Sequence, residues 1–254
     1  TDDILAANTT NTPLWLVVLA DIAAGTLCGL CNGFLVSRGK ISPMVATLIL
    51  MVAGRGIAQL ITNGQIMTVY YRPYWWFGNG FIFGLPVSIY IVLAIFLLAW
   101  VLVRKTSIGL FIESVGINAK STYYTGISEK NIKLFAYTFC GFCSAIAGLI
   151  LSSYIHGADA NNIGLNYELD AIFAVVIGGT MMSGGRFSLM ASVIGALIIW
   201  TFTITMYTFG VPANALLAGR AVLVLAVILL YSDYTLRILN VLSERKGSRH
   251  AATN

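Results

Sequence analysis

Two cysteine pairs have the residue type and the spacing that could bind a metal ion. They are Cys28 with Cys31 and Cys140 with Cys143, and this Cys-x-x-Cys spacing is typical of zinc and iron–sulfur sites. Both pairs, however, lie inside long apolar segments among small residues at three- and four-residue spacing. Small residues let membrane helices approach closely, and a thiol packs as one of them. We therefore interpret the cysteines as helix-packing residues and expect no metal site.

A glycine-rich stretch is the second segment whose residues could do chemistry. The pairs Gly178-Gly179 and Gly184-Gly185 bracket residues 180–183. A phosphate-binding loop would read GxxxxGK[ST], which is absent, so we expect the chain to bind no cofactor and no ATP itself. Glycine permits unusual backbone angles. The stretch therefore indicates either a tightly packed helix break or a hinge beside a transport pathway.

The sequence also lacks the residue sets of hydrolytic and metal-assisted catalysis. Its two histidines, His156 and His250, lie outside the apolar segments, and neither HExxH nor GxSxG occurs. A catalytic nucleophile needs an adjacent base, and a catalytic metal needs several ligands. We predict that the chain is not an enzyme.

The composition of the chain indicates that these residues lie on or between membrane-spanning helices. Of the 254 residues, 58% are hydrophobic and 10% are charged, against about 25% charged in a soluble domain. One or two cores could not hide this much apolar surface, and the low charge excludes intrinsic disorder. The chain is therefore predicted to be a polytopic membrane protein of the all-α class.

Six apolar runs are long enough to cross a bilayer as helices. A shorter run, 169–182, ends in the glycine-rich stretch and is predicted to be a broken or re-entrant helix. Counting it as one crossing gives a transmembrane helical bundle of about seven crossings. The six long runs are 14–36, 43–62, 86–103, 134–155, 188–209 and 213–231.

The Lys and Arg residues predict the orientation, because they gather on the cytoplasmic side. With the N-terminus outside, twelve of the 15 lie inside, Arg72 lies outside, and two lie within spans. We predict a transmembrane domain over 1–231, with its longest cytoplasmic loop at 104–133, and a basic cytoplasmic tail over 232–254. The inside residues are Arg38, Lys40, Arg104, Lys105, Lys120, Lys130, Lys133, Arg186, Arg237, Arg245, Lys246 and Arg249.

Two of the apolar runs resemble each other over seven residues. Segment 26–32 reads TLCGLCN and segment 138–144 reads TFCGFCS. In the predicted topology they cross the membrane in opposite directions. This is the arrangement of an inverted repeat, which is common in transporters.

Three charged residues, Asp21, Arg55 and Arg220, lie within apolar spans. Such a residue costs about 2.5–3.5 kcal/mol at a helix centre, so each should face protein or water. The alternatives are structural ion pairs and the lining of a pathway, for which the centrally placed Arg55 is the best candidate. Asp21 is the only deep acid that the sequence suggests, and it lies near one end of its span.

The loop 63–85 carries six aromatic residues between positions 70 and 77. Aromatic rings favour the membrane–water interface, although they could instead stack on a sugar or bind a partner protein. Polar residues along the spans that could contact a sugar are Asn32, Gln59, Thr180, Ser183, Trp200 and Thr203.

The loop 104–133 contains apolar residues near helical spacing. Gly116 and Asn118 suit a turn, and Gly126 suits a helix stop. The pattern predicts a short amphipathic helix that is either an interfacial element or a dock for a soluble partner. The apolar residues are Ile108, Phe111, Ile112, Val115 and Ile117.

Together these residues resemble the membrane permease subunits of bacterial ABC importers for monosaccharides, the ribose and galactofuranose group. The matching segments are PMVATL at 43–48 with Arg55-Gly56, the ExxGxN loop at 113–118 with Gly126-Ile127, and ELDAI…VIGGTxxSGGR at 168–186. Segment 157–162, GADANN, is most similar to the galactofuranose permease.

The resemblance implies three sets of site residues. The loop 113–126 would be the coupling loop, which sits in a groove of a separate ATPase. The glycine-rich stretch would be a hinge or would line the path, and the outside loops 63–85 and 156–168 would meet a sugar-binding protein. The ATPase-coupling residues are Glu113, Gly116, Asn118 and Gly126. The path or hinge residues are Arg55, Gly178, Gly179, Thr180, Gly184 and Gly185. The residues facing the binding protein are Asp159, Asn161 and Asn162.

The resemblance also implies partners and a location. The partners would be an ABC ATPase subunit that uses ATP, a second permease subunit (identical or different), a periplasmic sugar-binding protein and membrane lipid, but no nucleic acid. The chain would be a multi-pass protein of the bacterial inner membrane with a cytoplasmic C-terminus. A secondary transporter or channel for a small polar solute is the alternative, because it would share the composition and the broken helix.

The chain departs from the family pattern in three places. The family normally opens with two further spans and a GGIDLS motif, which is absent here, so we expect the sequence to lack its N-terminal part. The family often has Lys at the position of Arg220 and two alanines at the positions of Ser121 and Thr122.

Overall fold

The computed structural model describes residues 13–39, 41–124, 126–180, 184–185, 187–212, 215–216, 218–223 and 225. These residues form two compact units, 1–165 and 166–254, which are described separately. The predicted tail, 232–254, and the predicted boundary at residue 231 lie outside the described residues and stay predictions. The described part of the predicted span 213–231 is helical.

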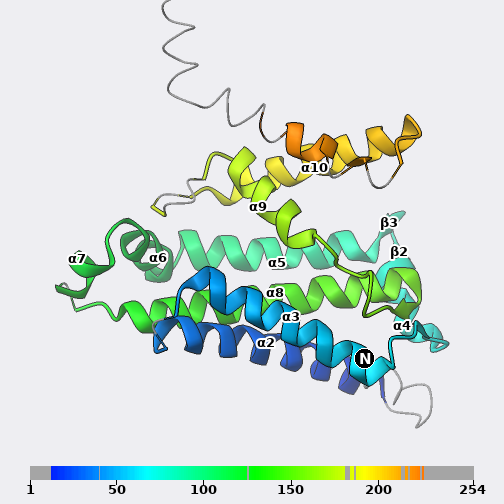
Figure 1. Ribbon diagram of the computed structural model, residues 1–254, viewed down its shortest axis with the longest axis horizontal. Coiled ribbons are helices and arrows are strands. Elements are labelled where there is room, and N and C mark those ends of the chain that lie inside the picture. The colour runs from blue at the N-terminus through cyan, green and yellow to red at the C-terminus, as the bar shows by residue number, and fades with distance from the viewer. Residues whose placement is uncertain are drawn as a thin grey trace, which may run out of the picture. The chain divides into compact units, whose positions relative to one another are not determined.

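Four long helices form the first unit (Figure 1): α2 (Leu14–Ser37), α3 (Pro43–Thr62), α5 (Val87–Arg104) and α8 (Glu129–Ile155). They confirm four of the predicted spans. Only the start of α8 differs by more than one residue, because the prediction followed apolar residues alone. Glu129 lies in the first turn of α8, where a negative charge is favourable, and forms an i,i+4 ion pair with Lys133.

Helices α2 and α8 pack against each other through their small residues. A Cβ atom added to Gly29 would lie 2.5 Å from the carbonyl oxygen of Tyr137, and one added to Gly25 would lie 2.5 Å from the Cβ of Ala145. A Cβ added to Gly141 would lie 2.5 Å from the carbonyl oxygen of Gly25. The backbones therefore touch, which confirms that small residues in the cysteine segments serve close helix packing.

The same contact has the symmetry of the proposed repeat. Gly29 and Gly141 occupy equivalent positions in the two similar segments, and they lie against each other. The four cysteines are free thiols, of which three are exposed and Cys143 is half-buried. The prediction that the cysteines themselves pack between helices is therefore wrong for the three exposed ones, and the neighbouring glycines make the close contacts. Within the described residues, no three His, Cys, Asp or Glu side chains gather as metal ligands.

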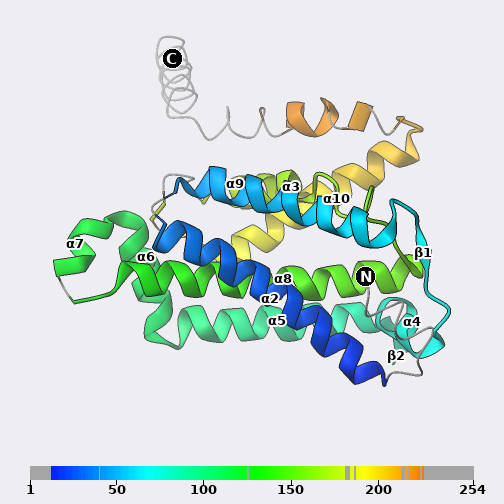
Figure 2. The ribbon, with the colours of Figure 1, turned by 60° about the horizontal axis from the view of Figure 1, so that its bottom comes forward.

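A folded cap, defined here as residues 63–86 and 156–165, covers one end of the first unit (Figure 2). In the cap β1 (Met67–Thr68) pairs antiparallel with β4 (Gly157–Ala158), so two loops predicted on the same side of the membrane are joined. Helix α4 (Arg72–Asn79) packs on the end of α8. A separate hairpin of β2 (Phe81–Ile82) and β3 (Leu85–Pro86) leads directly into α5.

The aromatic residues of the cap divide into two groups. Tyr74 is buried with Val69 and Leu149, and Trp75 packs against them and donates from Nε1 to the Val69 carbonyl oxygen at 2.8 Å. Tyr70 and Trp76 are exposed. The prediction of an aromatic interface therefore overlooked that several of these rings form the core of the cap.

Two short helices form the opposite end of the first unit, and we call residues 104–128 the corner. They are α6 (Ser107–Ile117) and α7 (Ala119–Tyr124). The predicted helix is confirmed, but the prediction of a turn at Gly116 is wrong, because this residue lies in the last turn of α6. The chain turns at Asn118, which is extended at φ −155° and ψ 98°.

The second unit contains α9 (Tyr167–Ile177), α10 (Leu189–Thr208) and the helical residues that follow position 214. The predicted helix break is confirmed. Helix α9 is capped at Gly178, and the glycines that follow, Gly179, Gly184 and Gly185, all have positive φ. A Cβ atom added to Gly178 would lie 2.7 Å from the backbone of Ala191, and one added to Gly195 would lie 2.1 Å from the carbonyl oxygen of Ala174. The break thus turns the chain so that α10 packs tightly on α9.

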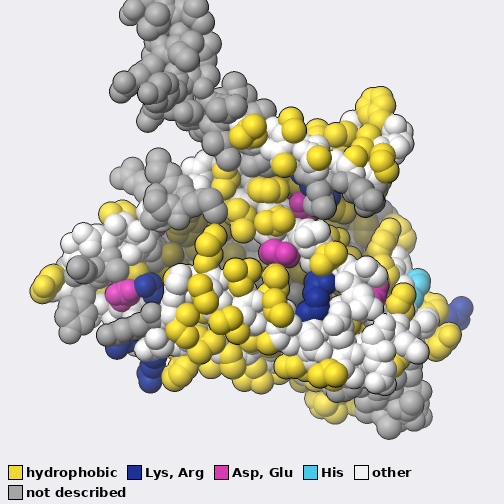
Figure 3. All heavy atoms as spheres, viewed as in Figure 1, with side chains coloured by type: hydrophobic (Ala, Val, Ile, Leu, Met, Phe, Trp, Pro, Cys, Tyr) yellow, Lys and Arg dark blue, Asp and Glu magenta, His cyan; other side chains and the backbone are white. Residues whose placement is uncertain are grey.

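Five of the described helices are long and apolar enough to cross a membrane: α2, α3, α5, α8 and α10. The described residues do not determine the full number of crossings. Hydrophobic side chains cover much of the surface in Figure 3, and at most 17% of each spanning window is buried within the protein. Most of these apolar side chains are therefore available to lipid or to other chains.

Candidate functional site

The corner is held together by backbone capping. The Asn118 side-chain oxygen accepts a hydrogen bond from the Ser121 amide at 3.1 Å, and Asx residues commonly cap a helix start in this way. The buried Thr122 hydroxyl donates to the Asn118 carbonyl oxygen at 2.8 Å and lies 3.0 Å from the Ser114 carbonyl oxygen. An alanine here would lack this link between α6 and α7.

Helix α6 is fixed on the end of α5. A Cβ added to Gly109 would lie 2.0 Å from the Val103 carbonyl oxygen, so only glycine fits there. Val115 is buried, whereas Ile117 is 68% exposed. The predicted apolar face therefore packs on the unit except at its last member, and the corner is a rigid element with an apolar tip.

The described coupling residues gather in this corner. Glu113 is half-buried in α6, Gly116 and Asn118 are exposed, and Gly126 has φ +82° at the turn before α8. The prediction that Gly126 ends a helical segment agrees with this angle. All four residues thus lie in the corner.

A second cluster joins α3 to the cap. Arg55 donates from Nη1 to the Asn161 carbonyl oxygen at 2.8 Å, and Gln59 donates from Nε2 to the Asn161 side-chain oxygen at 2.8 Å. Asn161 in turn donates from Nδ2 to the Gly64 carbonyl oxygen at 2.9 Å. Arg55 and Gln59 are one helical turn apart, so both reach the same loop. Among the described residues, Arg55 therefore bonds to a backbone carbonyl oxygen and forms no ion pair.

Asp159 organises the loop that carries Asn161. Its Oδ2 accepts from the Asn162 side-chain amide at 2.8 Å, and its Oδ1 accepts from the Asn161 amide at 2.8 Å and from the Asn162 amide at 3.2 Å. These bonds, first the one from the Asn162 side chain, lower the pKa of Asp159 because they favour the charged carboxylate. The three residues predicted to face a binding protein thus also shape their own loop.

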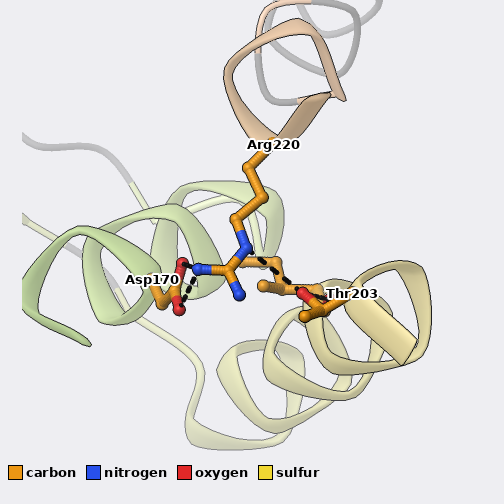
Figure 4. A network of polar contacts seen from close by, with 4 residues as sticks. Asp170, Thr203 and Arg220 are labelled. Carbon is orange, nitrogen blue, oxygen red and sulfur yellow. Dashed lines mark hydrogen bonds and ion pairs between the residues drawn. The ribbon is translucent and has the colours of Figure 1, made fainter. Parts of the chain in front are cut away.

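The third cluster is an ion pair in the second unit (Figure 4). Arg220 donates from Nη1 to both carboxylate oxygens of Asp170 in α9, each at 2.7 Å, and from Nε to the Thr203 hydroxyl in α10 at 3.2 Å. The Thr203 hydroxyl itself donates to the Ile199 carbonyl oxygen at 2.8 Å, so its oxygen is free to accept from Nε. One guanidinium therefore ties three helical segments together.

This pair decides between the alternatives that the sequence left open for Arg220. Its acid is Asp170, whose side chain is 21% exposed and which was overlooked because it stands at the start of the short run. For Arg220 the structural ion pair is confirmed. Arg55 instead bonds to Asn161, a residue that was predicted to face a binding protein.

The remaining polar candidates are scattered. Gln59 and Thr203 are engaged in the clusters above, Trp200 is exposed, and Ser183 lies outside the described residues. Buried oxygens of Asn32 and Thr180 have no hydrogen-bond partner among the described residues.

Long apolar helices, a tightly packed helix pair and polar clusters inside the spans define a polytopic helical membrane protein. Residues 4–231 match the protein family described as "Branched-chain amino acid transport system / permease component". The chain belongs to this family.

Sugar permeases are among its relatives. The chain is 48% identical to the galactofuranose transporter permease protein YtfT of Escherichia coli, over 86% of this chain and 64% of that protein. It is 42% identical to the fructose import permease protein FruF of Bifidobacterium longum, over 84% of this chain and 61% of that protein. It is 35% identical to the ribose import permease protein RbsC of Haemophilus influenzae, over 85% of this chain and 68% of that protein. The chain thus spans less than two thirds of the first two relatives. No solved structure matches it.

Proposed function

We propose that the chain is a transmembrane permease subunit of an ATP-driven importer for a monosaccharide, with galactofuranose as the first candidate sugar. The observation that carries the proposal is its similarity, over most of its length, to three proteins named as galactofuranose, fructose and ribose permeases. The subunit has no catalytic activity of its own. ATP is bound and hydrolysed by a separate subunit.

The corner is the proposed contact with the ATPase. A short helix fixed by Gly109 and by the Thr122 hydroxyl can pass a rigid-body movement to α5 and α8. ATP binding must favour one conformation of the permease over another for this contact to drive transport. A corner held by backbone hydrogen bonds is suited to that task.

The cap is the proposed contact with a periplasmic sugar-binding protein, and a second permease subunit completes the path. The protein then lies in the bacterial inner membrane with the corner and the C-terminus in the cytoplasm, which the distribution of Lys and Arg supports. Arg55 and the glycines 178, 179, 184 and 185, together with Thr180, are proposed to line the path or to act as its hinge.

The proposed function is tested by purifying the chain with the products of its neighbouring genes and reconstituting the complex in vesicles. Pentoses and hexoses, including galactofuranose, are supplied with the binding protein, and ATP hydrolysis and sugar uptake are measured. We expect one sugar to stimulate both. Uptake that continues without ATP, in a preparation that contains no ATPase, would show a secondary transporter instead.

Replacing Glu113 by Ala is expected to lower sugar-stimulated ATP hydrolysis while leaving membrane insertion intact, because Glu113 lies on the corner and not in a span. An insertion at Gly116 should have a larger effect, since it rotates the end of α6 relative to Asn118. The measurement is ATPase activity of the reconstituted complex with and without sugar.

The matched control is Glu129→Ala. This residue lies near the same end of the unit, and its exposed i,i+4 pair with Lys133 contributes at most about 0.5 kcal/mol. Equal coupling in the Glu113→Ala and Glu129→Ala proteins would remove Glu113 from the proposed contact.

A further inference from the structure

The hairpin β2–β3 exposes two aromatic rings on a strained turn. Phe81 pairs with Pro86 and Ile82 with Leu85, so Phe83 and Gly84 form a two-residue turn. Both have positive φ, +50° and +80°, which is the type I′ geometry that normally takes Asn-Gly. A bulky residue in this region is an outlier, and Phe83 is 99% exposed. Strain at an exposed apolar residue suggests a function for its ring.

The hairpin is nevertheless fixed in place. The Tyr90 hydroxyl of α5 donates to the Ile82 carbonyl oxygen at 3.2 Å, and the Val87 amide donates to the Gly80 carbonyl oxygen at 2.8 Å. Both bonds attach the hairpin to the first turn of α5. The position of the Phe83 ring is therefore set by the start of a membrane-spanning helix.

The exposed rings continue an apolar surface along α5. Residues 73–103 contain no Asp, Glu, Lys, Arg or His, and Phe81, Leu85, Ile89, Val92 and Leu93 are all exposed apolar side chains. Helix α5 has 18 residues, or about 27 Å at 1.5 Å per residue, which nearly equals the hydrocarbon thickness of a bilayer. With α5 across the bilayer, the hairpin lies at the boundary between acyl chains and headgroups.

We propose that the hairpin 81–86 is a membrane anchor that inserts the rings of Phe81 and Phe83 into this boundary. Aromatic residues favour this layer, and buried apolar area drives such insertion. A hairpin without charges, attached to a lipid-facing helix, fits a lipid surface better than the polar surface of a soluble protein. The anchor holds the cap at a fixed depth and is independent of which solute the protein carries.

The test places p-benzoylphenylalanine, a photo-crosslinking analogue of phenylalanine, at position 83 of the full-length protein in phospholipid nanodiscs. After illumination, adducts with phospholipid are measured by mass spectrometry. The same probe at Leu93, an exposed apolar residue in the middle of α5, is the positive control, and at Arg72, an exposed cap residue, the negative one. We expect lipid adducts at position 83 comparable to those at position 93.

A second variant separates insertion from folding. Phe83→Asn supplies the residue that the turn prefers, so the hairpin should fold at least as well, while the ring is lost. With the probe at Phe81, this variant should keep both the lipid adduct and the melting temperature in detergent, because the bonds to α5, and not the Phe83 ring, hold the hairpin in place. Lipid adducts at position 83 no greater than at position 72, or cross-links to a binding protein or to a second copy in their place, overturn the proposal.

Discussion

Replacing Arg220 by Gln is expected to destabilise the protein by about 3–5 kcal/mol, because it leaves the carboxylate of Asp170 inside the membrane domain without its partner. The two side chains are only 15% and 21% exposed, so little water reaches them to replace the lost bonds. The change should appear as a lower melting temperature of the purified protein and as a smaller folded fraction in the membrane.

The controls for this prediction follow from the geometry. Arg220→Lys keeps the charge and should retain most of the stability. The double variant Asp170→Asn, Arg220→Gln removes both charges and should recover much of the lost stability. Removing both charges costs less than leaving one of them buried without its partner. Thr203→Val removes the bond to Nε together with the bond within α10 to Ile199, keeps the ion pair, and should cost about 1 kcal/mol. A double variant as unstable as Arg220→Gln alone would show that the pair itself is not the cause.

Replacing Gly141 by Ala is expected to separate α2 from α8 and to destabilise the first unit by about 3 kcal/mol or more. The new Cβ would lie 2.5 Å from the carbonyl oxygen of Gly25 and 2.7 Å from the Cα of Gly29. Overpacking typically costs about 1–3 kcal/mol, and here both colliding atoms belong to the backbone and cannot rotate away. Thermal unfolding in detergent and the yield of folded protein measure the effect.

Gly148→Ala is the matched control on the same helix. No atom lies within 4 Å of the Cβ that it would add, and alanine is a better helix former than glycine by about 0.5–1 kcal/mol. This variant should be neutral or slightly more stable. If the two alanine variants behaved alike, the close approach of α2 and α8 at Gly141 would not contribute to stability.

The spans could be predicted from sequence because their signal is local. Length and apolar character alone defined α3 exactly and α2, α5 and α10 to within one residue at each end. The helix break was equally visible, because paired glycines allow backbone angles that other residues avoid. These features depend only on residues that are neighbours along the chain.

The polar clusters could not be predicted, because their members are distant in sequence. Arg55 and Asn161 are 106 positions apart, and Arg220 and Asp170 are 50 apart. Spacing in the sequence says nothing about such pairs. Asn161 was also assigned to a partner surface by family resemblance, which identifies a segment but not the bonds that its side chains make.

The hairpin was missed for a different reason. Hairpins are recognised by Asn-Gly or Asp-Gly between alternating residues, and this turn has Phe-Gly in a continuous apolar run. The start of α5 was nevertheless predicted to within one residue of Val87.

The glycine contact between α2 and α8 has a consequence for biosynthesis. Gly29 and Gly141 are 112 residues apart (141 − 29), so at about 5–20 residues per second the ribosome delivers the second some 6–22 seconds after the first. During that interval α2 is in the bilayer with its groove of glycines uncovered, and a chain arrested before α8 keeps it uncovered. Such truncated chains should pair with one another through α2, and the membrane insertion machinery must shield that groove until α8 arrives.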